Sequence, residues 1–380
     1  MRAAVLHEAG RRPPLAESRP LVVEEVDLDP PGSGEILVRI VAAGLCHSDL
    51  SAILGDRPRV VPAVLGHEAA GVVEDVGAHV DGVAVGDHVV LVFVASCGHC
   101  VQCAQGRPSL CEAAWRIRGQ GTLHSGARRL RLGGGVLHHY AGISAFAEYA
   151  VVSTASAVRI DPEVPLLDAA LFGCAVLTGV GAVVNTAGMP AGATAAVVGL
   201  GGVGLCALMG ARLSGASRLV AVDTNPKKLT LAASLGATDV FDARDPGCRE
   251  QVVEATSGGV EFAFDMTGVP KAFELAVSLT RRGGVTVTAG LPRPEATAAV
   301  PLAALVADER TIRGSYLGSC VPCRDVPRFL ALYRRGLLPV GRLRSGRLPL
   351  EGLNGGFDRM LRGESVRDVL EPGAPSRPRI

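Results

Sequence analysis

The 380-residue sequence predicts an α/β protein with a doubly wound parallel sheet in its second half and a β-rich domain in its first half. The main observation is residues 195–223, where an apolar run, a glycine-rich turn, a helical pattern and a second apolar run follow one another. Residues 176–317 continue to alternate strand-like and helix-like patterns, as a parallel sheet requires. Residues 1–95 instead hold short apolar runs broken by Gly and Pro, which is typical of an antiparallel domain.

The composition sets the broad class of the protein. Hydrophobic residues make up 48% of the chain, charged residues 20%, and the formal net charge is +1. A chain of this length can build two cores, and its charge balance favours neither nucleic acid nor an anionic membrane as a partner. No apolar run reaches the roughly 18 residues of a membrane helix, and the first residues lack a signal-like apolar stretch, so we expect a cytoplasmic protein. In that compartment, the ten cysteines are better interpreted as metal ligands or buried thiols than as disulfides.

Two polar groups interrupt the apolar runs of the first domain. They are Cys-His-Ser-Asp at residues 46–49 and Gly-His-Glu at residues 66–68. A buried His beside a Glu is, in isolation, more often a structural pair in a core than a metal ligand. Spacing alone therefore leaves both interpretations open for these residues.

The next segment carries a stronger signal, because four cysteines follow one another at short intervals in a Gly-, Gln- and Arg-containing loop. Cys97, Cys100, Cys103 and Cys111 form a C-x2-C-x2-C-x7-C pattern. Four thiolates at this spacing can surround a zinc ion tetrahedrally and stabilise a lobe, residues 95–113, that has little core of its own. An iron–sulfur cluster and a redox disulfide pair are the alternatives.

The glycine-rich turn of the second half has the spacing of the Rossmann dinucleotide-binding fingerprint. Gly199, Gly201 and Gly204 would allow a sharp turn, close approach of a pyrophosphate and tight packing of helix on strand. Asp223 follows about 20 positions later at a strand end, where its carboxylate can accept a ribose hydroxyl. The same carboxylate would repel a 2′-phosphate, so NAD is favoured over NADP. A glycine-rich turn that binds no nucleotide is the alternative, but the flanking apolar runs, the spacing of the glycines and the acidic residue Asp223 all argue against it.

Together with Phe-Gly-Cys at residues 172–174 and Gly-Glu-Ser-Val-Arg at residues 363–367, these motifs resemble the zinc-dependent medium-chain alcohol dehydrogenases. The resemblance covers nearly the whole chain and points to the long, dimeric branch of that family. It implies a GroES-like catalytic domain over residues 1–175, an NAD-binding Rossmann domain over residues 176–317, and a return to the catalytic domain over residues 318–380. It also implies an oxidoreductase that transfers hydride between an alcohol, aldehyde or ketone and NAD(H) through a zinc-bound alkoxide.

By this resemblance, Cys46, His67 and Cys174 hold a catalytic zinc with an open fourth position, and the four-cysteine lobe holds a second, structural zinc. Two thiolates, one imidazole and an open position are also a recognised catalytic zinc set. Asp49 would orient His67 from behind. Glu68 would tune the metal as a nearby carboxylate, with a plain structural hydrogen bond as the alternative.

The proton of the alcohol would pass first to Ser48, which stands next to the zinc ligands. The family's usual next acceptor is a histidine at the position held here by Ser51, and serine is no base near neutral pH. His47 could take the proton, water could replace the base, or the enzyme acts mainly as a carbonyl reductase. Our hypothesis is the water route, because Leu50 and Ser51 would leave a wet channel.

The resemblance supplies the remaining site residues. It implies cofactor contacts from His47, Thr178, Gly199, Gly201, Gly202, Val203, Gly204, Asp223, Lys228 and Arg367, with Thr178 and Val203 at the nicotinamide and Arg367 at the pyrophosphate. Phe93, Trp115 and Tyr140 are candidates for the substrate pocket, although each could equally be a core aromatic. Residues 298–312 resemble the edge that pairs in a homodimer.

The alternatives to this function differ in class. Within the family, the alternative is oxidation of a thiol–formaldehyde adduct. A zinc-free reductase or nucleotide-binding protein would not need ligand-competent residues at 46, 67 and 174. A nucleic-acid-binding cysteine lobe would need a basic face, which residues 97–111 lack.

Overall fold

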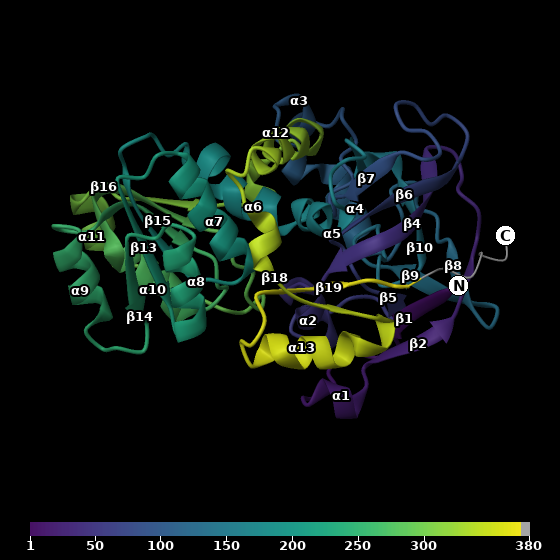
Figure 1. Ribbon diagram of the computed structural model, residues 1–380, viewed down its shortest axis with the longest axis horizontal. Helices are drawn as coiled ribbons and strands as arrows, with labels where there is room; N and C mark the ends of the chain where they lie inside the picture. Colours follow the sequence, from purple (N-terminus) through teal and green to yellow (C-terminus); the bar gives the residue numbers. More distant parts are fainter. Residues whose placement is uncertain (374–380) are drawn as a thin grey trace. The chain divides into compact units, whose positions relative to one another are not determined.

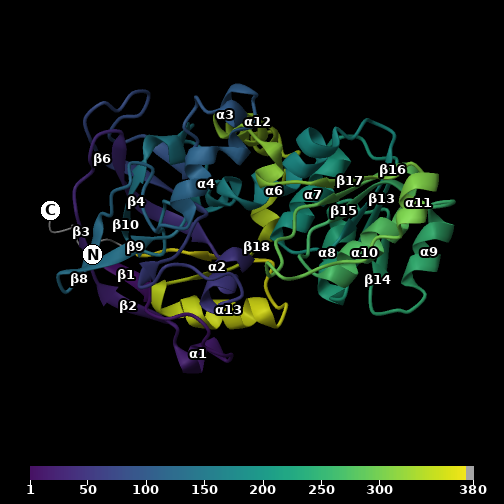
Figure 2. The same cartoon turned by 180° about the vertical axis from the view of Figure 1, so that it is seen from behind.

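The computed structural model describes residues 1–373. The predicted return segment spans residues 318–380, and its last seven residues, 374–380, lie outside the described residues. The chain divides into two compact units (Figures 1 and 2). Unit 1 comprises Met1–Cys174, Val321–Arg334 and Pro339–Ile380, and unit 2 comprises Ala175–Cys320 and Arg335–Leu338. The predicted limits of independently folding domains, at residues 175 and 317, remain predictions.

Unit 1 contains two mainly antiparallel sheets. The larger sheet has the order β11-β7-β6-β4-β19-β18, and β10 also pairs with β4. Its strands are β4 (Glu35–Gly44), β6 (Ala69–Val76), β7 (His88–Leu91), β10 (Tyr149–Ser153), β11 (Ala157–Ile160), β18 (Arg344–Leu348) and β19 (Arg367–Leu370). The smaller sheet consists, in order, of β2 (Leu21–Glu25), β1 (Arg2–Leu6), β5 (Ala63–Val64), β9 (Gly135–His139), β8 (Leu130–Leu132) and β3 (Asp27–Leu28).

The long central strand β4 shows how the sequence pattern builds this unit. Ile36, Val38 and Ile40 belong to one buried cluster, whereas Leu37 belongs to another. Alternate side chains of a strand point to opposite faces, so a strand covered on both faces is apolar at nearly every position. β4 therefore joins two cores.

The end of the chain returns to unit 1. The helices of this unit are α1 (Leu15–Ser18), α2 (His47–Ile53), α3 (Val101–Ala104), α4 (Glu112–Arg118), α5 (Leu166–Ala169), α12 (Pro322–Arg334) and α13 (Leu353–Leu361). Both views show α13 beside α1 (Figures 1 and 2). The backbone N–H groups of Leu15 and Ala16 donate to the carboxylate of Asp358 at 2.7 and 2.8 Å, so α13 caps the first turn of α1.

Unit 2 is built on a six-stranded, fully parallel sheet of order β14-β13-β12-β15-β16-β17. This is the strand order of the doubly wound dinucleotide-binding fold, so the predicted fold class is confirmed. The strands are β12 (Thr194–Val198), β13 (Arg218–Asp223), β14 (Asp239–Asp242), β15 (Val260–Asp265), β16 (Thr280–Thr288) and β17 (Thr311–Gly314). The helices are α6 (Ala175–Gly181), α7 (Gly202–Leu213), α8 (Pro226–Ser234), α9 (Cys248–Ala255), α10 (Pro270–Leu279) and α11 (Leu302–Ala307).

The turn between β12 and α7 depends on glycine. Gly199 has φ +87°, in the left-handed region that favours glycine. A Cβ on Gly204 would lie 1.7 Å from the carbonyl oxygen of Gly199, so helix and strand approach more closely than any side chain would allow. The first N–H groups of α7 have no side-chain cap at Gly201, which leaves them available to an anion.

A helix that spans a membrane must be both long enough and apolar enough to cross its hydrocarbon core. Within residues 1–373, no single helix meets both requirements. The helical segments Leu166–Gly173 and Ala175–Ala187 are separated by a bend of 56°, and they meet the length and apolarity requirements only when they are taken together.

Candidate active site

Three connections of unit 1 bring Cys46, His67 and Cys174 together. Cys46 lies between β4 and α2, His67 between β5 and β6, and Cys174 directly after a 3₁₀ turn, Ala170–Gly173. The ligand-competent atoms of the three side chains all lie within 4.8 Å of one another. All three residues are buried. Two sulfurs and one imidazole nitrogen at this spacing fit a zinc ion that keeps a fourth position for another ligand.

Two glycines allow the connections to approach this closely. Gly66 has φ +91°, and a Cβ there would lie 2.6 Å from the backbone nitrogen of Phe146. A Cβ on Gly173 would lie 2.1 Å from the carbonyl oxygen of Leu91 in β7. Larger residues at either position would push His67 or Cys174 away from the cluster.

A buried carboxylate sets the orientation of His67. Oδ1 of Asp49 lies 3.0 Å from Nδ1 of His67 and also accepts the Gly66 N–H at 3.2 Å. Because Nδ1 faces the carboxylate, Nε2 presents its lone pair to a metal. Burial opposes the charged imidazole, but Asp49 and the Cys46 thiolate outweigh it and raise the pKa of His67 to about 10. The same negative charges would also stabilise a metal cation bound at Nε2 of His67.

Arg367 lies behind the metal-ligand cluster. Its Nη1 donates to the carbonyl oxygen of Leu45 at 2.6 Å, and its Nη2 lies 3.6 Å from Oε2 of the fully buried Glu68. A hydrogen bond from Cys174, together with the positive charge of Arg367, lowers the pKa of Cys46 well below its usual range despite burial. Sequence reasoning missed this pairing, since it linked Arg367 only to a pyrophosphate. That cofactor contact stays a prediction.

Two of the three predicted pocket aromatics lie against His67. The ring centroids of Phe93 and Tyr140 lie 5.5 and 5.7 Å from that of His67, both edge-on. The hydroxyl of Tyr140 donates to the carbonyl oxygen of Ser48 at 2.9 Å. Trp115 is instead 70% exposed on α4, so its place in the substrate pocket stays a prediction.

Helix α2 carries the residues expected to handle the proton. His47 is exposed, while Ser48 and Ser51 are half-buried. Leu50 is only 2% exposed and belongs to the main core of unit 1. The expectation that Leu50 borders a wet channel is therefore wrong, because Leu50 lies on the apolar face of the helix. Of Leu50 and Ser51, only Ser51 has access to water.

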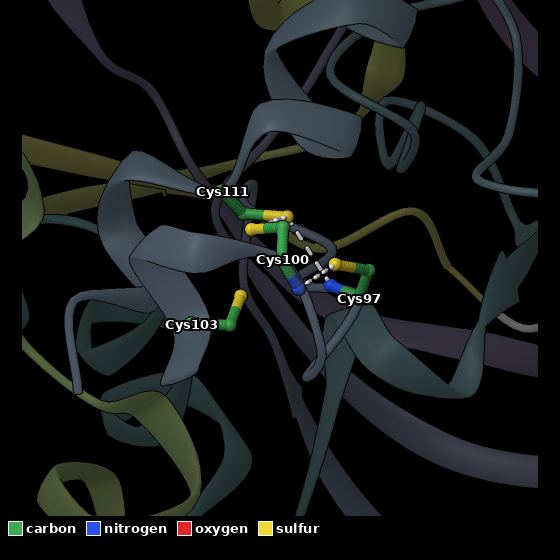
Figure 3. Close-up of side chains that lie close together, drawn as sticks. All are labelled: Cys97, Cys100, Cys103 and Cys111. Atoms are coloured by element: carbon green, nitrogen blue, oxygen red, sulfur yellow. Dashed lines mark hydrogen bonds between the residues drawn. The ribbon is translucent and has the colours of Figure 1, made fainter. Parts of the chain in front are cut away.

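The four-cysteine lobe forms a second cluster (Figure 3). The sulfurs of Cys97, Cys100, Cys103 and Cys111 all lie within 4.8 Å of one another. The N–H of Cys97 donates to Sγ of Cys111 at 3.2 Å, and the N–H of Cys100 donates to Sγ of Cys97 at 3.3 Å. The amide of Cys103 is the main reason that the pKa of Cys100 falls to about 6. Burial instead raises the pKa of Cys103 to about 12. The four sulfurs nevertheless have the number and spacing that suit a tetrahedral structural zinc.

The residues expected to bind the cofactor lie in unit 2, apart from His47 and Arg367. Asp223 ends β13, where its carboxylate accepts the N–H of Leu200 at 2.6 Å and that of Asn225 at 2.8 Å. Its oxygens are therefore fixed beside the glycine-rich turn. Thr178 and Val203 lie on α6 and α7, which pack closely, and Lys228 lies on α8. This arrangement fits an adenine dinucleotide at the end of β12.

Comparison with known proteins defines the family. Residues 32–162 match the alcohol dehydrogenase GroES-like domain and residues 202–335 match the zinc-binding dehydrogenase domain. An S-(hydroxymethyl)glutathione dehydrogenase of Synechocystis sp. is 37% identical over 97% of this chain and 99% of its own length. An alcohol dehydrogenase zinc-binding domain protein of Burkholderia ambifaria has a TM-score of 0.92 and 35% identity, with 99% of each chain covered. For a benzyl alcohol dehydrogenase of Acinetobacter calcoaceticus the TM-score is 0.90 and the identity 31%, with 97% of this chain and 98% of that chain covered.

The chain therefore belongs to the zinc-dependent medium-chain alcohol dehydrogenases. It is an oxidoreductase that acts on small-molecule alcohols or carbonyl compounds, and its cofactors are zinc and NAD. Both cysteine-containing clusters fit the metal. The roles of individual site residues remain predictions.

The link between Asp49 and His67 gives a testable expectation. We expect Asp49→Ala to weaken zinc binding at one of the two sites by about 10- to 100-fold, because the imidazole loses its orienting partner. Asp49→Asn keeps an acceptor and should have a smaller effect. Elemental analysis after dialysis against a chelator measures this. Asp87→Ala, which removes a half-buried carboxylate that accepts the N–H of Ala84 in a turn, is the control. Full retention of both zinc ions by Asp49→Ala would contradict the assignment.

Proposed function

We propose that the preferred substrate is a primary alcohol with an apolar, preferably aromatic, group on its carbinol carbon. The observation that carries the catalytic assignment is the buried set Cys46, His67 and Cys174, with Asp49 behind the imidazole. When bound, zinc would polarise the alcohol oxygen and lower its pKa, while NAD would accept the hydride. The three ligands hold the metal, and Asp49 keeps Nε2 of His67 free to bind it.

Ser48 takes the proton from the alcohol in this proposal. Its hydroxyl stands one helix turn from Ser51, the position at which the family resemblance predicts a base. Neither Ser48 nor Ser51 can keep an added proton near neutral pH. The Ser48 hydroxyl therefore releases its own proton as it accepts that of the alcohol, and water beside the half-buried Ser51 receives the released proton. A general base contributes typically 10²- to 10⁴-fold in a step that it limits, and water recovers part of that.

The aromatic walls support the choice of substrate. The rings of Phe93 and Tyr140 each form a T-shaped contact with the ring of His67, so the carbinol carbon would lie beside apolar ring surfaces. Such walls suit a planar apolar group more than a polyol. The likeness to a benzyl alcohol dehydrogenase supports the same choice.

A thiol–formaldehyde adduct is the second candidate, and one observation favours it. The guanidinium carbon of Arg59 lies 6.0 Å from the ring centroid of Tyr140, so a cation stands beside the proposed pocket. Peptide thiols such as glutathione carry carboxylates that a guanidinium can bind. The relative named S-(hydroxymethyl)glutathione dehydrogenase supports this candidate.

A substrate panel distinguishes the two candidates. We expect kcat/KM for NAD-linked oxidation to be at least about tenfold higher for benzyl alcohol than for S-(hydroxymethyl)glutathione, because an apolar wall does not bind a charged peptide. Arg59→Met should lower kcat/KM for the adduct alone. A tenfold preference for the adduct that disappears in Arg59→Met would establish the second candidate. The absence of NAD reduction with every alcohol would overturn the proposal.

Asp223 is proposed to select NAD over NADP. Its carboxylate would accept a ribose hydroxyl and repel a 2′-phosphate. We expect Asp223→Ser to reduce the ratio of kcat/KM for NAD to that for NADP by at least about tenfold, or about 1.4 kcal/mol. Asp242→Ser removes a half-buried carboxylate from the end of the neighbouring strand and should leave the ratio unchanged. A native preference for NADP would show that Asp223 does not have this role.

A cytoplasmic homodimer completes the proposal. None of the ten cysteines, all of which lie within residues 1–373, forms a disulfide, which suits a reducing compartment. Leu302 and Val306 of α11 are 72% and 77% exposed within residues 298–312, the segment expected to pair. Sedimentation should give twice the chain mass of 39.1 kDa, and Leu302→Glu combined with Val306→Glu should give the monomer. A native monomer would contradict the dimer.

A further inference from the structure

Tyr140 is held rigidly at the end of β9. This strand pairs in parallel with β5, which leads into the turn that carries His67. Directly after Tyr140 the chain reverses, because Ala141, Gly142 and Ser144 all have positive φ angles. The N–H of Tyr140 donates to Oγ of Ser144 at 3.0 Å, and the carbonyl of Tyr140 accepts the N–H of Ile143 at 3.0 Å. The backbone of Tyr140 is thus fixed on the strand pair that also positions His67.

The hydroxyl of Tyr140 reaches a different element of the site. It donates to the carbonyl oxygen of Ser48, 92 positions away, at 2.9 Å. Ser48 lies in the first turn of α2, between Cys46, whose carbonyl accepts the Asp49 N–H at 3.1 Å, and Asp49, whose side chain is bonded to His67. No side chain caps the N-terminus of α2. The bond from Tyr140 therefore ties this turn directly to the strand pair.

We propose that Tyr140 is a positioning residue for Ser48, holding the peptide of this serine so that its hydroxyl meets the alcohol oxygen. The inference rests on the proposed function, in which Ser48 accepts the proton. Proton transfer needs heavy atoms within about 2.6–3.2 Å, and a displacement of about 1 Å can cost up to about 10²-fold in rate. Ser48 has a short side chain, so the position of its hydroxyl follows its backbone. Tyr140 does not take the proton itself, because its own hydroxyl proton is used in the bond to Ser48 and burial raises its pKa above the usual range.

The experiment is a double-mutant cycle with Tyr140→Phe, Ser48→Ala and both together. Tyr140→Phe keeps the ring against His67 and removes only the hydroxyl. With benzyl alcohol and NAD, we expect Tyr140→Phe to lower kcat about tenfold, to change KM less than about twofold and to raise the solvent deuterium isotope effect. In the Ser48→Ala background, Tyr140→Phe should change kcat less than about twofold, since residues that act as a unit are not additive.

Tyr333→Phe is the matched control, because it removes a hydroxyl that donates to Asp168 at 2.6 Å elsewhere in unit 1. It should leave kcat and the isotope effect unchanged. Zinc content is measured for every variant.

Several results would overturn the inference. An equal fall in kcat from Tyr140→Phe in both backgrounds would mean that Tyr140 does not act through Ser48. A loss of zinc from Tyr140→Phe would assign the effect to His67, and an unchanged kcat would remove the role altogether. If Ser48→Ala itself leaves alcohol oxidation unchanged, the proton path of the proposed function fails. That result is distinguishable from failure of the Tyr140 inference alone, in which Ser48→Ala is slow but the two effects add.

Discussion

The constraint on which unit 1 depends is the burial of several acidic groups at one point. Asp49 and Glu68 are fully buried, and Cys46 and Cys174 are each only 6% exposed. A buried charge without a partner costs several kcal/mol, so this set is stable only if cations compensate it. Arg367 supplies one cation, and a metal ion in the proposed site of Cys46, His67 and Cys174 would supply another. Metal binding at that site would then contribute to the folding free energy of this unit.

The strands of unit 1 and their connections bring these buried groups together. The β4–α2 connection, the β5–β6 connection and the residue after a 3₁₀ turn each provide one of the three proposed ligands, and glycines allow these backbones to meet. In the proposed site, Asp49 would orient His67, whereas Tyr140 would position Ser48. Asp49 joins α2 to His67, and Tyr140 joins α2 to β9. The reactive groups are thus held by bonds between elements far apart in the sequence, and this arrangement can position a proton acceptor to a fraction of an ångström.

Much of this was predictable from local patterns, and the rest was not. The short spacing of Cys97 to Cys111 and the glycine spacing of residues 199–204 each describe a local shape, so the sequence predicted the lobe and the β12–α7–β13 unit. Cys46, His67 and Cys174 are too far apart for any periodicity to connect them, and only resemblance to a family did so. The pairing of Arg367 with Glu68 and the bond from Tyr140 to Ser48 join distant segments without a sequence signal. The expectation for Leu50 was wrong because the buried face of a two-turn helix is set by tertiary packing.

X-ray absorption at the zinc edge, combined with elemental analysis, tests the central claim most directly. The account predicts two zinc ions per chain, one with four sulfur neighbours and one with two sulfurs, one imidazole nitrogen and an oxygen. Mild chelation should remove the second environment together with alcohol oxidation, while the four-sulfur environment remains. One zinc per chain, or a spectrum containing sulfur neighbours alone, would contradict the assignment of Cys46, His67 and Cys174 as the catalytic centre.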